Sequence, residues 1–171
     1  MGDIDQSGSQ ALAHNIQASK HTDEHILSIQ HWSPTVLSFR TTRNLNFRFT
    51  AGHYARLGLP AAEQGSWVFR PYSVVSPTSA DYLEFLVVLI PGGAFSQLLE
   101  NVRVGSVIRI EKLAYGFLTL DRLAAGRDLW MIASGTGVGP FLSILHEPAA
   151  WQQYQRLIVV HSVRHRAELA Y

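Results

Sequence analysis

The sequence predicts an antiparallel all-β domain, a barrel or sandwich, followed by the first part of an α/β domain with a parallel sheet. Residues 24–124 carry short alternating segments that turns separate at intervals of roughly ten residues, the pattern of an all-β fold. After Ala124-Ala125-Gly126-Arg127 the pattern changes to the strand–helix–strand rhythm of a parallel sheet. The expected elements there are a strand over 129–134, a helix over 140–146, a strand over 157–163 and a helix start near 166. The 171 residues are 47% apolar, which is enough to build a core.

The composition excludes several classes of function. The 14 basic and 13 acidic residues give a net charge of +1, so the chain lacks the basic surface of a protein that binds nucleic acid or anionic membranes. Because the chain has no cysteine, it has no disulfide, no thiolate nucleophile and no cysteine-ligated iron–sulfur cluster. The 8 histidines are scattered without metal-ligand spacing, and no metal site is predicted. Any electron carrier must therefore be a bound organic cofactor.

Nothing in the hydropathy pattern indicates a membrane protein. The longest apolar run, 86–91, is far too short to cross a bilayer. The N-terminus lacks a basic start followed by an apolar segment, as a secretory signal would require. We therefore expect a cytoplasmic protein.

The first half of the chain divides into an extension and a series of short strands. Residues 1–23 are polar and without sustained periodicity, which predicts a disordered extension. From Glu24 apolar and polar residues alternate on both sides of a turn at Ser33-Pro34-Thr35, which predicts a pair of antiparallel strands. The later strands are expected at 55–59, 68–75, 82–90, 107–111 and, as the last of the all-β domain, 117–120.

The segment Arg70-Pro71-Tyr72-Ser73 lies inside the expected strand 68–75. Its proline has no N–H group to donate to a neighbouring strand, which is typical of a strand at the edge of a sheet. Because successive side chains of a strand point to opposite faces, Arg70 and Tyr72 lie on the same face. Arginine suits a phosphate and tyrosine suits a flat ring system, so the pair indicates one ligand that carries both. The alternative is an edge strand with a surface arginine and a half-buried tyrosine.

Residues 91–101 predict a turn and a short helix. In Pro91-Gly92-Gly93-Ala94-Phe95-Ser96, we expect Ser96 to cap the helix that follows, which would leave a positive pole suited to an anion. The alternative is an ordinary helix that covers one end of the all-β domain.

A glycine turn follows the first strand of the second region. Residues 135–140 read Gly-Thr-Gly-Val-Gly-Pro, between an apolar strand and a helix with proline at its expected first position. A dinucleotide can approach a helix N-terminus over such a turn, although the spacing differs from the G-x-G-x-x-G fingerprint. The alternative is a tight turn without a ligand.

Together these motifs resemble those of bacterial ferredoxin–NADP+ reductases. Residues 70–73 resemble the R-x-Y-S flavin motif of the family, and residues 135–140 resemble its G-T-G-x-G/A-P motif on the nicotinamide side. The order and separation of the two agree with the short bacterial members. Segments 49–54, 91–96, 104–106 and 168–171 match as well, so the resemblance runs from about residue 25 to the last residue.

The resemblance implies two domains and two nucleotides. Residues 24–124 would form a Greek-key β barrel that binds FAD, and residues 125–171 the N-terminal, incomplete part of a domain that binds NADP. The family passes a hydride between nicotinamide and flavin N5, and single electrons between the flavin and ferredoxin or flavodoxin.

The resemblance also assigns roles to individual residues. It places Arg70 on the FAD pyrophosphate, Tyr72 against the isoalloxazine and Ser73 near N5, so that Tyr72 and Ser73 are the candidate catalytic residues. Strict alternation would turn Ser73 to the face away from Tyr72, so its role rests on the resemblance alone. Thr136 would lie where flavin and nicotinamide meet, and Val163 and Arg164 where the 2′-phosphate of NADP is read. The remaining candidate contacts are Pro71, Leu86, Ala94, Phe95, Ser96, Gly135 and Gly137.

Two other functions stay open. Within the same superfamily the chain could be the reductase component of an oxygenase, or a ferric-siderophore reductase. From a different class, it could be a flavin-carrying module without turnover of its own.

Overall fold

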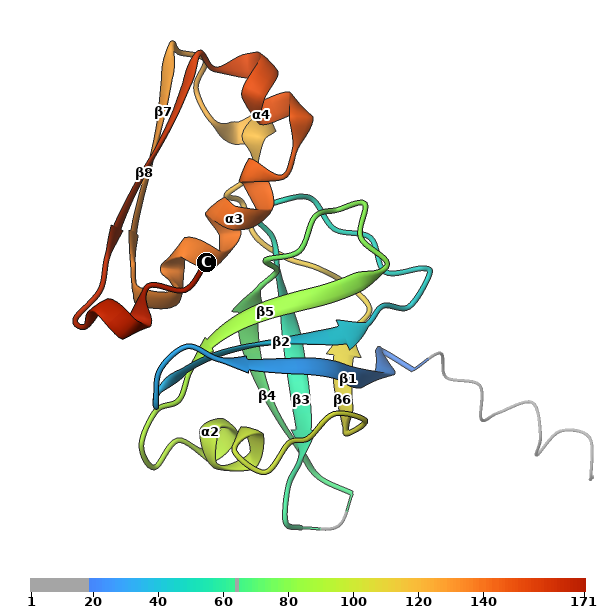
Figure 1. Ribbon diagram of the computed structural model, residues 1–171. Helices are drawn as coiled ribbons and strands as arrows, with labels where there is room; N and C mark the ends of the chain where they lie inside the picture. The colour runs from blue at the N-terminus through green and yellow to red at the C-terminus, as the bar shows by residue number, and fades with distance from the viewer. Residues whose placement is uncertain (1–18, 64) are drawn as a thin grey trace, which may run out of the picture.

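The computed structural model describes residues 19–63 and 65–171, which form two sheets (Figure 1). Six strands make one antiparallel sheet in the order β4-β3-β6-β1-β2-β5, and two make a parallel sheet, β7-β8. The first sheet contains β1 (His21–His31), β2 (Val36–Thr42), β3 (Tyr54–Pro60), β4 (Trp67–Ser73), β5 (Tyr82–Val88) and β6 (Val107–Glu111). The second contains β7 (Asp128–Ser134) and β8 (Arg156–Ser162). The predicted change from antiparallel to parallel strands is confirmed.

The six-stranded sheet curls until its two edge strands meet at one end. Val74, which follows β4, forms an antiparallel bridge with Phe85 of β5, and the N–H of Val75 donates to the carbonyl of Glu84 over 2.8 Å. Alternate residues of every strand enclose one apolar core. Its least exposed members include Ala55, Leu57, Val74, Phe85, Val87 and Ile108, each with 0% of its surface accessible.

The β1–β2 hairpin forms where the sequence predicts a pair of strands. The Ser33 hydroxyl accepts the N–H groups of Thr35 and Val36, at 3.2 and 3.0 Å, and so closes the turn. However, β1 begins at His21 and pairs with β6, so residues 21–23 lie in a strand although their polar sequence indicates an extension. Pairing with a neighbouring strand outweighs the local pattern here. The rest of the predicted extension, 1–18, lies outside the described residues.

The expected strand over 117–120 is wrong. Phe117 is 76% exposed with the Arg122 guanidinium 4.9 Å from its ring centre, and a short 3₁₀ helix follows over Leu120–Arg122. The segment has no ladder partner among the residues that the structure describes, and it crosses the end of the sheet beside Gly52. A Cβ atom on Gly52 would lie 1.7 Å from the carbonyl oxygen of Leu118, and its φ is +96°. Only glycine fits this crossing.

The second unit packs one helix between its sheet and the six-stranded sheet and a second helix beside the first. Figure 1 shows α3 (Gly139–Leu145) between β7–β8 and the larger sheet, with α4 (Pro148–Gln153) beside it. The helix α4 is not among the elements predicted from the sequence, although Pro148 at its first turn is a typical start signal. Ser143 on α3 donates to the carbonyl of Ser76 over 3.0 Å, and Thr78 donates to the Glu147 carboxylate over 2.6 Å. The loop after β4 is thus tied to the second unit.

Among residues 19–63 and 65–171, no helix is long and apolar enough to span a bilayer. Within the same residues, no group of three or more His, Asp or Glu side chains is arranged to hold a metal ion.

Candidate functional site

The two sequence motifs lie side by side although they are far apart in the chain. The Gly139 backbone packs against the end of β4: a Cβ atom on Gly139 would lie 3.4 Å from Cγ2 of Val75 and 3.7 Å from Cβ of Ser73. The glycine turn therefore sits directly beside the strand that carries Arg70 and Tyr72.

Arg70 occupies an edge strand, as its neighbour Pro71 predicts. β4 is the last strand of the sheet, and Pro71 faces Arg56 of β3. Arg70 is exposed, and its Nη1 donates to the carbonyl of Phe69 over 2.7 Å. A guanidinium carries five N–H donors, so most of its donors point to solvent and can reach an anion.

Tyr72 offers a ring that the protein holds in place. The ring packs on Phe95 of α2 (Ala94–Leu99), with centroids 5.3 Å apart and planes 43° apart. Burial raises the pKa of Tyr72 to about 12, partly offset by the Arg70 charge, so its hydroxyl is neutral at physiological pH. Ser73, the next residue, is half-buried and lies opposite Tyr54.

The expected Ser96 cap is wrong. The helix begins at Ala94 with Gly93 as its N-cap, and no side chain caps it. Ser96 is buried, and its hydroxyl instead accepts the N–H of Ile90 over 2.9 Å. The Pro91-Gly92 turn explains this. The Gly93 N–H donates to the Ile90 carbonyl over 2.9 Å, and the Ile90 N–H is then directed at the Ser96 hydroxyl.

Leu86 lies inside the molecule. It is 5% exposed and packs with Ala133 and Val138 in the apolar cluster that joins the two sheets. Ala94 is exposed at the start of α2. The structure thus brings Arg70, Tyr72 and Phe95 together at the edge of the first sheet, where Ser96 holds the turn before α2, whereas Leu86 lies apart from them in the cluster that joins the two sheets.

The predicted nucleotide residues, except Gly137, line one cleft at the carboxyl ends of β7 and β8. Its volume is about 540 Å³. Four of its lining residues were predicted: Gly135, Thr136, Val163 and Arg164. Gly135 has a φ of +54°, and a Cβ atom on Gly135 or on Gly137 would meet no atom within 4 Å. The backbone of the turn therefore faces open space, where a ligand can approach closely.

Sequence reasoning missed five lining residues of this cleft. They are Val36, Val88, Ser134, Ser162 and Glu168. Ser134 and Ser162 end β7 and β8, and ligands of parallel sheets bind at that end of the strands, a rule that could have found them. Val36 and Val88 come from the six-stranded sheet, so only the packing of the two sheets reveals them.

Two hydrogen bonds set the shape of the cleft. Oε2 of Glu168 accepts the N–H of Arg164 over 3.2 Å, which closes the turn after β8. The His161 ring Nε2 lies 2.8 Å from the Gly135 carbonyl and joins β8 to the glycine turn. A cation, open backbone amides and strand-end hydroxyls make a suitable donor set for a phosphorylated nucleotide.

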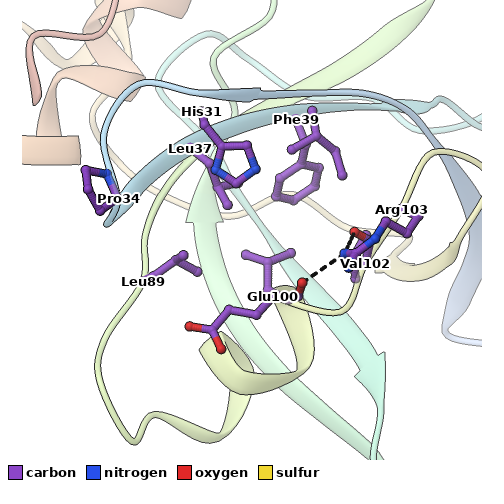
Figure 2. Close-up of a pocket in the computed structure, with 10 residues that line it drawn as sticks. His31, Pro34, Leu37, Phe39, Leu89, Glu100, Val102 and Arg103 are labelled. Atoms are coloured by element: carbon purple, nitrogen blue, oxygen red, sulfur yellow. Dashed lines mark hydrogen bonds between the residues drawn. The ribbon is translucent and has the colours of Figure 1, made fainter. Parts of the chain in front are cut away.

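A separate cavity lies between the β1–β2 hairpin and α2 (Figure 2). Its volume is about 240 Å³, and none of the predicted site residues lines it. Arg103 at its rim already donates from Nη1 to the carbonyls of Glu100 and Val102, at 2.9 and 2.8 Å. The cavity is therefore separate from the site beside β4.

Comparison with known proteins bears on both halves of the site. Residues 26–114 match the model of a family described as the oxidoreductase FAD-binding domain. The chain is 36% identical over 148 residues to a ferredoxin–NADP reductase of Pseudomonas aeruginosa, covering 86% of this chain and 57% of that protein. It is also 36% identical over 146 residues to a flavodoxin/ferredoxin–NADP reductase of Rhodobacter capsulatus, covering 85% and 54%.

A solved structure shows the same relationship. The crystal structure of a ferredoxin–NADP+ reductase from Neisseria gonorrhoeae, with bound FAD and NADP, has a TM-score of 0.85 and 40% identity. The similarity covers 88% of this chain and 61% of that one. The chain spans about half the length of the curated relatives that it matches.

Proposed function

The chain belongs to the oxidoreductase FAD-binding domain family, and from that membership we propose that it is part of a flavoprotein reductase that uses FAD and NADP(H). We propose that it transfers electrons between NADP(H) and ferredoxin or flavodoxin, the partners named for its relatives. One observation carries the proposal: the glycine turn packs on Ser73, which puts the cleft beside the strand of Arg70 and Tyr72.

The residues at the edge of the first sheet fit FAD. FAD needs a cation for its pyrophosphate and a flat apolar surface for its ring system, and Arg70 and Tyr72 supply them from one strand. A Cβ atom on Gly92 would meet nothing within 4 Å, so the turn before α2 is also open to a ligand. Arg70, Pro71, Tyr72, Ser73 and Ala94 would therefore hold FAD, with Phe95 and Ser96 buried behind them and Leu86 in the cluster that joins the two sheets.

The cleft fits NADP(H). Gly135, Thr136 and Gly137 present open backbone, and Arg164 presents a guanidinium on the same side, next to Val163. A guanidinium recognises a 2′-phosphate and finds no equivalent group on NAD, so we propose a preference for NADP(H).

The reaction needs both ligands to meet near Ser73 and Thr136. Bound FAD would supply a carrier that takes two electrons as a hydride and returns them singly. Tyr72 keeps its proton because of its raised pKa, so it serves as a neutral surface and not as a base. The hydroxyls of Ser73 and Thr136, one from each half of the site, would orient the reacting ends by hydrogen bonding.

The finer description of the fold is part of the same proposal. The curled sheet would be a closed Greek-key barrel over residues 24–124, and residues 125–171 would begin an NADP-binding domain, in a cytoplasmic protein. Among the described residues, helices cover only one face of the β7–β8 sheet. This favours a second candidate function, a module that binds FAD without efficient turnover. Trp130 and Ile132 are 59% and 71% exposed on one face, whereas parallel sheets are ordinarily covered on both.

An absorbance spectrum tests both candidates. The chain loaded with FAD should show a bound-flavin spectrum, and NADPH should bleach it under anaerobic conditions if the cleft delivers nicotinamide to the flavin. Binding of FAD without bleaching would favour the module, and failure to bind FAD at all would contradict the proposal.

A further inference from the structure

The C-terminal segment of the chain returns from the cleft to the six-stranded sheet. After β8, residues 163–168 form the loop and 3₁₀ turn beside the cleft, and residues 169–171 then run back toward β2 and β5 (Figure 1). Ala170 is 6% exposed, within the apolar cluster that joins the two sheets. The hydroxyl of Tyr171 donates to Oε1 of Glu84 on β5 over 2.7 Å.

Glu84 is placed to receive that hydroxyl. Its residue surface is 7% exposed, and its second oxygen, Oε2, accepts from Nε of Arg40 over 2.9 Å. A buried carboxylate needs a partner for each oxygen, because an unpaired one is costly. Desolvation of its hydroxyl end raises the pKa of Tyr171 above its usual value, a hydrogen bond with Ser38 offsets part of this and the Glu84 carboxylate adds to it, although the residue as a whole is 53% exposed; the hydroxyl therefore remains a donor.

The ring of Tyr171 is held as well as its hydroxyl. It packs on Trp32, with centroids 5.0 Å apart, and Trp32 is fixed by its own hydrogen bond to the Ser38 hydroxyl over 3.1 Å. The backbone of Tyr171 has a φ of +66°, which residues other than glycine adopt infrequently. The contacts of the side chain therefore outweigh the preference of the backbone.

The segment between β8 and Tyr171 is fixed at both ends. The Glu168 carboxylate closes its first turn onto Arg164, and Tyr171 ties its far end to the six-stranded sheet. We propose that Tyr171 is a positioning residue of the cleft, whose hydrogen bond to Glu84 holds residues 163–170 so that Arg164 faces the bound nucleotide. That the bound nucleotide is NADP(H) rests on the proposed function. The hydrogen bond between Tyr171 and Glu84, which we call the anchor, is a property of the fold.

A single hydroxyl deletion tests the anchor. Tyr171→Phe should speed amide hydrogen exchange of residues 163–170 and weaken binding of 2′,5′-ADP, measured by calorimetry, about five- to tenfold, the value of one net hydrogen bond. FAD affinity should stay within about twofold, because Arg70 and Tyr72 lie on β4 in the other unit. Tyr82→Phe is the matched control: Tyr82 lies on β5, the strand of Glu84, with the Arg40 guanidinium 4.5 Å from its ring centre, and no hydrogen bond of its hydroxyl is found among the described residues.

A double variant separates the anchor from a general structural role. If Tyr171 acts through Glu84, Tyr171→Phe combined with Glu84→Gln should loosen residues 163–170 no more than the stronger single change does. Unchanged exchange in Tyr171→Phe would overturn the inference, as would equal losses of 2′,5′-ADP and FAD affinity. If the unmodified chain binds no 2′,5′-ADP, the proposed nucleotide site fails, and the exchange data alone decide whether the anchor exists.

Discussion

The two sheets of the molecule obtain their burial in different ways. The six-stranded sheet curls around its own core, so Leu57 and Phe85 are fully buried by residues of the same unit. The β7–β8 sheet buries Met131 and Ala133 under the helices, while Trp130 and Ile132 on the other face are 59% and 71% exposed. Since burial of apolar surface is the main driving force of folding, the first unit should be stable by itself and the second should depend on its neighbours.

The difference matters for the candidate site because each half of it belongs to one unit. Arg70 and Tyr72 stand on the self-sufficient sheet, whereas Thr136 and Arg164 stand on the dependent one. We therefore expect the flavin half to be preorganised and the nucleotide half to be sensitive to anything that loosens the contact between the units. The variants below test that contrast, from the largest expected effect to the smallest.

The largest effect is expected where the two units meet. Gly52→Ala puts a methyl group 1.7 Å from the Leu118 carbonyl at a φ of +96°, so it should cost more than about 4 kcal/mol of unfolding free energy, measured by urea denaturation. Gly92→Ala is the matched control, since its φ is +73° but a Cβ there meets nothing within 4 Å. It should cost only about 1–2 kcal/mol. Equal losses in the two variants would mean that the crossing beside Gly52 can move aside.

The contrast in burial predicts that truncating a large side chain lowers the unfolding free energy much more in the first unit than on the outer face of the second. Phe85→Ala removes a ring that is 0% exposed and should cost about 3–5 kcal/mol in the same measurement. Ile132→Ala shortens a side chain that is 71% exposed and should change stability by less than about 0.5 kcal/mol. A large loss for Ile132→Ala would show that the outer face of β7–β8 is covered in solution, and the comparison between the units would fail.

Ligand binding should separate the two halves of the site. Arg70→Ala should weaken FAD binding by about 2 kcal/mol, as expected when a charged hydrogen-bonding partner is lost, and should leave 2′,5′-ADP binding nearly unchanged. FAD affinity can be followed by the quenching of flavin fluorescence. Equal FAD affinity in the variant and the unmodified chain would remove Arg70 from the flavin site.

The complementary change lies in the cleft. Arg164→Ala should weaken 2′,5′-ADP binding about tenfold, because a guanidinium that contacts a phosphate contributes about 1.5 kcal/mol. Binding of 5′-AMP, which lacks the 2′-phosphate, should change little in the same calorimetric experiment. If the two nucleotides lose affinity together, Arg164 supports the loop and does not read the phosphate.

Sequence reasoning succeeded where a pattern is local and failed where a distant contact decides. The alternating strands, the edge position of Pro71 and the strand–turn–helix around Gly135 follow from short-range rules, and all three are present in the structure. The strand state of residues 21–23 depends on pairing with β6, which lies far along the chain. The hydroxyl of Ser96 accepts a hydrogen bond from the Ile90 N–H, a contact that no capping pattern indicates.

The site shows the same division. Thr136 could be predicted because its motif is contiguous in sequence, and Arg164 because the resemblance assigns a role to the residues that follow the second parallel strand. Val36 and Val88 of the cleft come from strands of the other unit, so their place depends on how the two units pack. Glu84 lies among apolar residues of a strand, where a charged residue is unexpected, and this anomaly indicates that the carboxylate has a polar partner. That the partner is Tyr171 depends on the path of the chain after β8.

The smallest effect concerns an ion cluster at the start of the parallel sheet. Asp128 opens β7 opposite Arg156 of β8, and its carboxylate accepts hydrogen bonds from both Arg156 and Arg127. These two guanidinium groups hold the pKa of Asp128 well below its usual value. Both arginines are largely exposed, so salt screens the pairs and their contribution is modest.

The sign of the pH effect follows from that lowered pKa. A carboxyl group whose pKa is lower in the folded state contributes stability above its unfolded pKa of about 4 and loses it as pH falls toward the folded value. Amides of β7 and β8 should therefore exchange faster relative to those of β3 and β5 as pH falls from about 5 to 3, after correction for the intrinsic exchange rate. Asp128→Asn should loosen β7 and β8 already at pH 7, and the gap between variant and unmodified chain should close at low pH. A gap that stays constant with pH would show that the carboxylate charge is irrelevant to the pairing of the two parallel strands.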